Sequence, residues 1–516
     1  MNGADALVKT LLAAGVDTCF ANPGTSEMHF VAALDREPAM ACVLCLFEGV
    51  ATGAADGYAR MADKPAATLL HLGPGLANGL ANLHNAKRAR TPIVNIVGDH
   101  ATYHRVHDAP LTADVEGTAR PYSDWVRTAR TAHDVGPDGA AAVAAALQPP
   151  GRIATLILPA DTAWSDSARG PAAPEPLEAP RPVPTERVEA MAALLRGGEP
   201  CALLITGKGL RAHGLETAAR IAAATGCRIM APVNNGRIER GAGRVPIDRL
   251  PYPVDEAVAY LAGLRHLILV GAPAPAIFFA YPGKPSLPTP PDCGIHTLAA
   301  PGDDTVAALE ALEAALGARS QAMEVVRRNP APPPQGASIT LERLADSVRA
   351  LLPDSAILID EGISASATFY AGLREAPAHD WLHLTGGSIG IGLPLATGAA
   401  IACRNRKVVC LQADGSALYT VQALWTMARE NLDVTTLIFD NRTYATLIGE
   451  LAKVGAGNAG RRALDMMSLD RPAIGWAELA RSFGVEGTRV DTLDGFNAAF
   501  RSAMADRGPK LIAVAV

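Results

Sequence analysis

The chain has 516 residues, of which 49% are hydrophobic and 19% charged, so it can bury large cores and should form two to four domains. Its formal net charge of −6 is spread without runs of like charge, which argues against nucleic acid as a partner. No stretch of about 18 uninterrupted apolar residues occurs, and the N-terminus lacks a basic start, so we expect neither a membrane span nor a signal peptide. The scattered cysteines are typical of free thiols in a reducing cytosol and predict a cytoplasmic protein.

Two proline-rich passages, residues 170–186 and 329–336, divide the chain into three blocks that we expect to fold as separate domains. The blocks cover residues 1–169, 187–328 and 337–516. Each block alternates short β-branched runs with amphipathic segments rich in Ala and Leu, which is the βαβ pattern of parallel sheets. The predicted fold class is therefore α/β, with three doubly wound parallel-sheet domains.

In the first block, polar side chains follow three of the predicted strands. The strands and the helix expected in the first two blocks are Val16–Phe20, Cys42–Phe47, Gly49–Met61 (helix), Ala67–Leu70, Pro92–Val97, Ala154–Leu158, Ala202–Ile205, Arg228–Pro232 and His266–Val270. Thr25, Glu48 and His71 come after the first, second and third strands of the chain. Each is ordinary turn chemistry by itself, but three such ends of one predicted sheet fit a functional site better.

In the third block, a strand–helix–strand unit indicates a metal and diphosphate anchor. Strands are predicted over Val408–Leu411 and Val434–Phe439, with a helix capped by Ser416 between them. Asp414 follows the first strand, and Asn441 and Thr443 follow the second. Open α/β sheets bind ligands at such strand ends, and carboxylate, amide and carbonyl oxygens suit Mg²⁺ that takes its remaining ligands from a phosphate.

Longer motifs resemble a known family. Asn-Pro-Gly-Thr, Glu-Gly before Ala-Thr-Gly-Ala-Ala-Asp-Gly-Tyr-Ala-Arg, and Gly-Pro-Gly-x-x-Asn-Gly resemble the pyrimidine-binding domain of the thiamine-diphosphate enzymes of the acetolactate synthase and benzoylformate decarboxylase family. Residues 386–394 and the Ala-Asp-Gly-Ser turn resemble the diphosphate domain of the same family. The three blocks would then be a pyrimidine-binding, a central and a diphosphate-binding domain.

The resemblance implies cofactor roles for residues at both ends of the chain. Glu48 would share a proton with the aminopyrimidine, and Ile389 would wedge the two cofactor rings together. Asp414, Asn441 and Thr443 would hold Mg²⁺. The remaining positions that the family pattern assigns to cofactor binding are Ser364, Gly387, Gly415, Ser416 and Tyr444.

The reaction implied is non-oxidative decarboxylation of a 2-oxo acid through an enamine, with Thr25 and His71 near the substrate carboxylate. The second histidine of benzoylformate decarboxylase, expected after Gly271-Ala272-Pro273, is absent here, which leaves the proton donor open. Glu450 falls where relatives place an aromatic residue, and it is either a pocket acid or a solvated helix residue. His100, His104 and His107 are spaced like metal ligands but more typical of a loop near the pocket mouth.

We also consider several alternatives to a 2-oxo acid decarboxylase. The enamine could instead join a second carbonyl compound, as in an acetolactate-synthase-like carboligase. A non-catalytic paralogue is disfavoured by Glu48, and a nicotinamide oxidoreductase by the lack of a Gly-x-Gly-x-x-Gly after a strand. FAD is not expected, because residues 234–238 do not reproduce the flavin segment of acetolactate synthases. The family also implies a homodimer or homotetramer with active sites shared between subunits.

Overall fold

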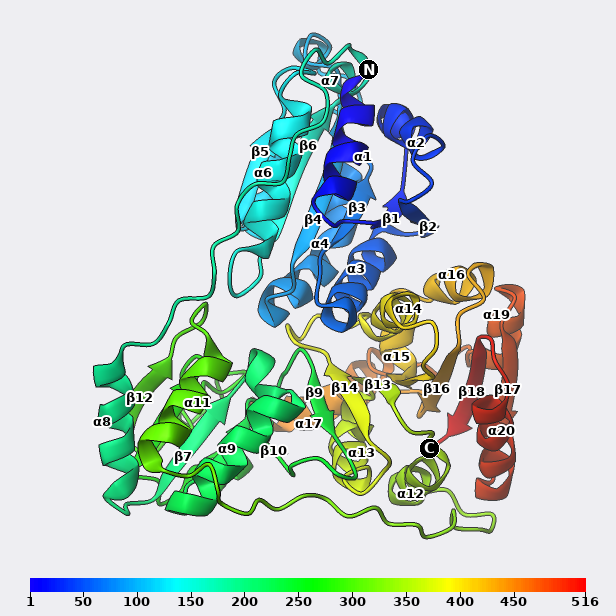
Figure 1. The fold of residues 1–516 in the computed structure, drawn as a ribbon. Helices are drawn as coiled ribbons and strands as arrows, with labels where there is room; N and C mark the ends of the chain where they lie inside the picture. The colour runs from blue at the N-terminus through cyan, green and yellow to red at the C-terminus, as the bar shows by residue number, and fades with distance from the viewer.

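Residues 1–516 of the computed structural model form three α/β units, each organised around its own β-sheet (Figure 1). The sheets have six, five and seven strands, and they confirm the predicted α/β class with three mainly parallel sheets. The domain boundaries themselves stay a prediction. Helix α8 (Thr185–Arg196) already begins inside the first proline-rich passage.

The N-terminal unit has helices on both faces of its sheet. Its strands lie in the order β2 (Ala41–Leu44), β1 (Thr18–Asn22), β3 (Ala66–Leu70), β4 (Ile93–Asp99), β6 (Ile153–Pro159) and β5 (Trp125–Thr128). The helices are α1 (Gly3–Ala13), η1 (Thr25–Glu27), α2 (Met28–Leu34), α3 (Glu48–Ala62), α4 (Leu72–Ala89), η2 (Arg105–His107), α5 (Val115–Ala119), α6 (Val135–Leu147) and α7 (Ala160–Trp164). Helices α1 and α6 pack together, as do α3 and α4. Because β2, β1 and β3 are neighbours, their carboxyl ends lie side by side.

The central unit is smaller. Its strands lie in the order β10 (Asp248–Arg249), β8 (Arg228–Ala231), β7 (Cys201–Ile205), β11 (His266–Val270) and β12 (Gly294–Ala299). Its helices are α8, η3 (Gly207–Leu210), α9 (Ala212–Thr225), α10 (Val254–Leu261) and α11 (Thr305–Leu316). A long irregular loop joins β11 to β12 and reaches the third unit, as described below.

The C-terminal unit contains the largest sheet. Its strands lie in the order β17 (Glu486–Val490), β18 (Lys510–Ala515), β16 (Val434–Asp440), β15 (Val408–Ala413), β13 (Ala356–Glu361), β14 (His379–His383) and β9 (Ile238–Arg240). Its helices are α12 (Leu341–Leu351), η4 (Ile363–Ala365), α13 (Ser366–Gly372), α14 (Gly392–Ala402), α15 (Asp414–Ala417), α16 (Ala423–Arg429), α17 (Ala445–Lys453), α18 (Arg461–Asp465), α19 (Trp476–Ser482) and α20 (Leu493–Ala505). Strand β9 comes from the central block and pairs antiparallel with β14, which the sequence did not predict.

The hydrophobic cores cross the unit boundaries. One core combines apolar residues of α3 and α4 with residues of α14 and α16, and a second combines the central sheet with α13 and α20. Helices α3 and α14 pack closely because both are rich in small residues: a Cβ on Gly57 or Gly398 would overlap the backbone of the other helix. The N-terminal and C-terminal units are therefore held rigidly together within one chain.

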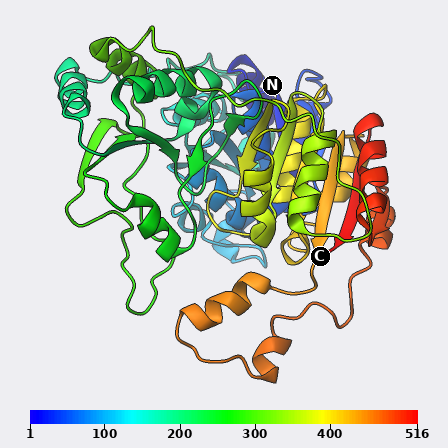
Figure 2. The same ribbon diagram turned by 90° about the horizontal axis from the view of Figure 1, so that it is seen from below.

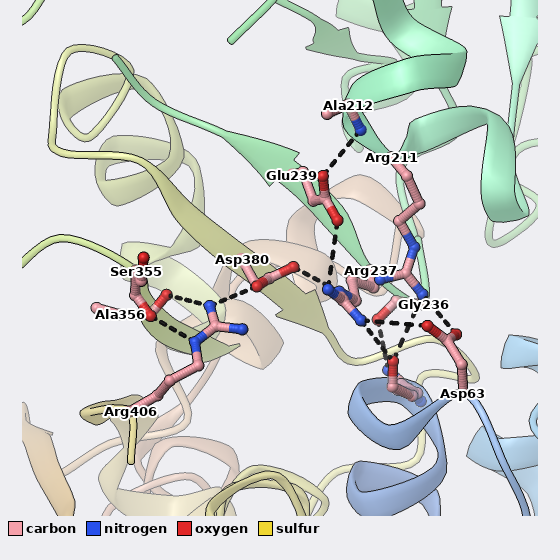
Figure 3. Close-up of polar contacts among 11 residues, drawn as sticks. Asp63, Arg211, Ala212, Gly236, Arg237, Glu239, Ser355, Ala356, Asp380 and Arg406 are labelled. Carbon is pink, nitrogen blue, oxygen red and sulfur yellow. Dashed lines mark hydrogen bonds and ion pairs between the residues drawn. The ribbon is translucent and has the colours of Figure 1, made fainter. Parts of the chain in front are cut away.

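A buried polar junction fixes all three units near β9 (Figure 3). The Arg237 guanidinium pairs with Asp380 of β14 and with Glu239, and its Nη1 donates to the backbone oxygen of Arg60 at 3.2 Å. Arg406 contacts the second Asp380 oxygen at 2.5 Å. Burial alone would raise the pKa of Asp380, but the two guanidinium groups hold it below its usual value. Removing one partner would leave a buried charge uncompensated.

The prediction of one continuous helix from Ser416 onward is partly wrong. Strands β15 and β16 match the prediction, but helix α15 ends at Ala417 and α16 begins only at Ala423. Ser416 is not an N-cap: its hydroxyl donates to the Ala413 oxygen at 3.1 Å and accepts from the Gln412 amide at 2.6 Å. The apolar spacing through residues 418–425 is typical of one helix, but tertiary packing interrupts it.

Candidate active site

Thr25, Glu48 and His71 lie at adjacent strand ends of the N-terminal sheet. Thr25 opens η1 after β1, Glu48 opens α3 after β2, and His71 precedes α4 after β3. These strands are consecutive in the sheet. The structure therefore brings the three predicted residues to the carboxyl end of the same sheet, and their roles there stay predictions.

Glu48 is buried against the start of α4. The Asn78 side-chain amide donates to Glu48 Oε2 at 3.0 Å. A Cβ on Gly75 would lie 2.9 Å from Glu48 Oε1 and 3.3 Å from His71 Cβ, so glycine there lets the two side chains approach. Asn78 belongs to the Gly-Pro-Gly-x-x-Asn-Gly motif, but the sequence alone did not predict its contact with Glu48.

His71 is held by a buried acid that the sequence reading overlooked. Its Nδ1 lies 2.8 Å from Glu27 Oε2, which also accepts the Gly24 N–H at 2.7 Å. Burial raises the pKa of Glu27, and the hydrogen bond with His71 opposes that rise. A Cβ on Gly24 would overlap the imidazole. With Nδ1 facing the carboxylate, Nε2 is the ring atom left to contact a ligand.

The loop at residues 386–392 is shaped by a second overlooked acid, Glu361 at the end of β13. This buried carboxylate accepts the backbone N–H groups of Gly390 and Gly392, each at 2.6 Å, and that of Ile391 at 3.3 Å. The Gln412 amide donates to it at 3.0 Å. Burial raises its pKa, and these hydrogen bonds act in the opposite direction. These hydrogen bonds hold residues 390–392 in place, next to the loop residues Gly387 and Ile389.

Asp414, Asn441 and Thr443 also come together, at the ends of β15 and β16. The Arg442 N–H donates to Asp414 Oδ2 at 2.7 Å, and the Thr443 N–H donates to Asn441 Oδ1 at 3.0 Å. Arg442 takes φ +55°, which folds the turn back over Asp414. Nearby, a Cβ on Gly415 would meet the Tyr444 ring at 2.5 Å, so the glycine keeps this turn narrow.

The oxygen atoms of Asp414, Asn441 and Thr443 suit a Mg²⁺ ion whose remaining ligands come from a phosphate. Burial raises the pKa of Asp414, and the neighbouring Asp440 carboxylate adds to this rise. A divalent cation would relieve both effects. No cluster of three or more His, Cys, Asp or Glu side chains able to hold a metal occurs in the chain, and Asp414 is the one carboxylate among the three predicted ligands. Oxygen donors with open positions are what Mg²⁺ requires when it bridges to a diphosphate.

Within one chain, the two groups of residues are linked only through other residues. Asn82 Nδ2 donates to the Gly49 oxygen at 2.7 Å and to the Gly390 oxygen at 3.3 Å, so α4 connects the start of α3 to the 386–392 loop. No hydrogen bond joins Thr25, Glu48 or His71 to Asp414, Asn441 or Ile389.

The remaining sequence candidates are Ser364, Glu450 and the three histidines at positions 100, 104 and 107. Ser364 is exposed in η4, directly after β13, and makes no hydrogen bond. Glu450 lies in α17, is partly buried and accepts hydrogen bonds from Tyr281 and Lys453, and its role stays a prediction. The rings of His100, His104 and His107 follow one another at centroid distances of 5.5 and 5.7 Å at the start of an exposed loop.

Comparisons with known proteins identify the family of this chain. Residues 1–117 match the family described as "Thiamine pyrophosphate enzyme, N-terminal TPP binding domain", and residues 363–514 match "Thiamine pyrophosphate enzyme, C-terminal TPP binding domain". The first range contains the Glu48 site, and the second contains the Asp414 site. Thiamine diphosphate is thereby supported as the cofactor.

Whole-length relatives are also found. A Mycobacterium tuberculosis protein named "Putative acetolactate synthase large subunit IlvX" is 51% identical over 100% of this chain and 99% of its own. Benzoylformate decarboxylase of Pseudomonas aeruginosa is 28% identical over 97% of this chain and 96% of its own. The fold is shared with the solved thiamine diphosphate-dependent 4-hydroxybenzoylformate decarboxylase of Rhodococcus jostii RHA1, with a TM-score of 0.86, 24% identity and coverage of 100% and 99%. The chain therefore belongs to the thiamine pyrophosphate enzymes and is an enzyme of the decarboxylase or carboligase type.

Proposed function

We propose that the protein catalyses the non-oxidative decarboxylation of a small 2-oxo acid, in the manner of benzoylformate decarboxylase. The observation that carries this proposal is His71, which the buried Glu27 holds beside Glu48 with its Nε2 free. An imidazole in this place can bind a substrate carboxylate and can exchange a proton with the substrate carbon after CO₂ leaves. Thr25, at the neighbouring strand end, adds a hydroxyl that can bind the same carboxylate.

The chain's other residues would bind and orient the cofactor. When bound, thiamine diphosphate would supply the nucleophilic carbon and accept the electron pair released with CO₂. Glu48 would share a proton with the aminopyrimidine, and the 386–392 loop would set the ring geometry through Ile389. Asp414, with Asn441 and the Thr443 carbonyl, would hold Mg²⁺ against the diphosphate.

A carboligase is the second candidate, because the relative with 51% identity carries the name of an acetolactate synthase. The same residues would serve both reactions up to the loss of CO₂. The reactions differ in whether a proton or a second carbonyl compound then reacts with the substrate carbon.

We further propose that active sites are completed between subunits of a dimer or tetramer. No hydrogen bond joins the pyrimidine-end residues to the diphosphate-end residues in one chain, and both groups lie at the carboxyl ends of strands. Large apolar side chains beside these ends are exposed: Leu46 by 45%, Leu418 by 36% and Tyr419 by 53%. A second copy could cover them while supplying the opposite half of the site. Cytoplasmic location stays a prediction, and no helix is long and apolar enough to cross a membrane.

The test is to incubate the protein with Mg²⁺, thiamine diphosphate and a panel of 2-oxo acids that differ in side chain. CO₂ release would be followed in parallel with aldehyde and acyloin products, with the Glu48→Gln protein as the matched control. We expect CO₂ with an equal amount of aldehyde from at least one acid. Acyloin as the main product would favour the carboligase instead. Cofactor binding without CO₂ from any acid would contradict both.

A further inference from the structure

Helix α17 follows directly after the turn that carries Asn441 and Tyr444, yet none of its residues is buried. Figure 2 shows α17 and α18 below the C-terminal sheet, set apart from the other helices of that unit. Leu447 and Ile448 are exposed by 51% and 37%. Since apolar burial within its own unit does not fix α17, other contacts must determine where this helix lies.

One of these contacts comes from the central unit. The Tyr281 hydroxyl, in the loop between β11 and β12, donates to Glu450 Oε2 at 2.7 Å. A Cβ on Gly455, just after α17, would lie 3.7 Å from Pro282, so the two segments also approach beside this hydrogen bond. Burial and the Glu450 carboxylate both raise the pKa of Tyr281, so the phenol stays protonated and donates at all physiological pH values.

The same central loop also reaches the 386–392 loop of the C-terminal unit. A Cβ on Gly387 would overlap the Phe278 ring, so Phe278 rests directly on the 386–392 loop. Phe278 contacts Phe279 and Tyr252, with ring centroids 4.8 and 5.5 Å away. This aromatic group anchors the loop only three residues before Tyr281. One segment of the central unit therefore contacts both the loop and the helix that border the proposed cofactor site.

We propose that Tyr281 and Glu450 are positioning residues whose hydrogen bond holds α17 to the central unit as a latch and so limits how often the turn that carries Asn441 and Tyr444 moves away from the bound cofactor. The proposal rests on the proposed function, because it takes the cofactor roles of Gly387, Asn441 and Tyr444 from there. When the latch opens, α17 and the turn before it would move away together. Cofactor release would then follow the open fraction.

The latch is tested first in the cofactor-free protein, by hydrogen–deuterium exchange of residues 445–453 followed by mass spectrometry. A hydrogen bond to a carboxylate shifts a local opening equilibrium by about tenfold or more. We therefore expect exchange in this segment to be about tenfold faster in Tyr281→Phe, with other peptides unchanged. Glu450→Gln keeps an acceptor oxygen and should stay close to wild type, whereas Glu450→Leu should behave like Tyr281→Phe. Lys453→Ala removes a partner of Glu450 on the same helix and is the matched control, with no change expected.

The second measurement is the rate at which bound thiamine diphosphate leaves, followed by chasing labelled cofactor with unlabelled cofactor in the presence of Mg²⁺. Tyr281→Phe should release it about tenfold faster than wild type and Lys453→Ala. Unchanged exchange in Tyr281→Phe would overturn the latch. Faster exchange with an unchanged release rate would overturn its control of cofactor release. If wild type bound no cofactor, the proposed function would fail, and the exchange experiment would still decide whether the hydrogen bond holds α17.

Discussion

Replacing Glu361 by Gln tests whether the 386–392 loop is held in place by this one buried carboxylate. Each Glu361 oxygen accepts two donors in the structure: Oε1 serves Gly390 and Ile391, and Oε2 serves Gly392 and Gln412. Glutamine keeps one acceptor oxygen and presents an NH₂ group to the other pair. Two buried donors then lose their acceptor, at about 1–3 kcal/mol each. Relief from burying a charge offsets part of this cost, so we expect a net loss of about 2 kcal/mol in unfolding free energy.

Urea unfolding would measure that loss, and titration with thiamine diphosphate and Mg²⁺ would show whether the loop is the part affected. We expect the cofactor to bind at least tenfold more weakly to Glu361→Gln. The matched control is Glu313→Gln, which changes an equally buried glutamate in α11 that pairs with Arg220 far from the loop. The control should lose stability but keep its cofactor affinity. Wild-type stability and affinity in Glu361→Gln would refute the reasoning.

Three other perturbations address the rest of the site. Asp414→Asn should abolish stabilisation by Mg²⁺ with cofactor. In the metal-free protein, burial raises the folded pKa of Asp414 above the unfolded value of about 3.9, so the stability of wild type relative to Asp414→Asn should be highest at acidic pH and should fall as pH rises through the folded pKa. A difference in melting temperature that moves in favour of wild type as pH rises would count against this assignment. Gly24→Ala should displace His71 and reduce kcat/KM about tenfold or more with cofactor affinity unchanged in a titration; unchanged kinetics would remove His71 from the mechanism. Mixing inactive Glu48→Gln and Asp414→Ala proteins after dissociation and reassociation should restore about a quarter of wild-type activity if sites are shared, and none if each site lies within one chain.

The sequence predicted the sheets and the strand ends well because these depend on local patterns. Buried β-branched runs over Val408–Leu411 and Val434–Phe439 allow few alternatives to parallel strands, and both strands formed there. Polar residues directly after such strands must lie at the sheet edge, so Asp414 and Asn441 could be placed without a structure.

The missed features depend on contacts between distant segments. Glu27 reads as a turn residue, and only the fold shows its carboxylate bonded to His71, 44 residues later. The sequence places Glu361 at the end of a strand, and its backbone donors lie 29, 30 and 31 residues further on. Strand β9 leaves the central block because its partner β14 offers a free edge and because Arg237 finds Asp380 there. No local sequence pattern predicts these pairs of residues. A charged residue at the end of a buried strand does indicate that a partner lies nearby, because buried charges are paired or hydrogen-bonded.

The central claim is that Glu48 activates thiamine diphosphate bound by this chain. It is tested most directly by the rate at which the thiazolium C2 proton exchanges with deuterium, measured by NMR after acid quench, in wild type and Glu48→Gln. The amide cannot share a proton with the aminopyrimidine, so we expect exchange to slow about a hundredfold, or about 3 kcal/mol in barrier, while cofactor affinity stays within a few fold. Equal exchange rates in the two proteins, with the cofactor bound to both, would contradict the account.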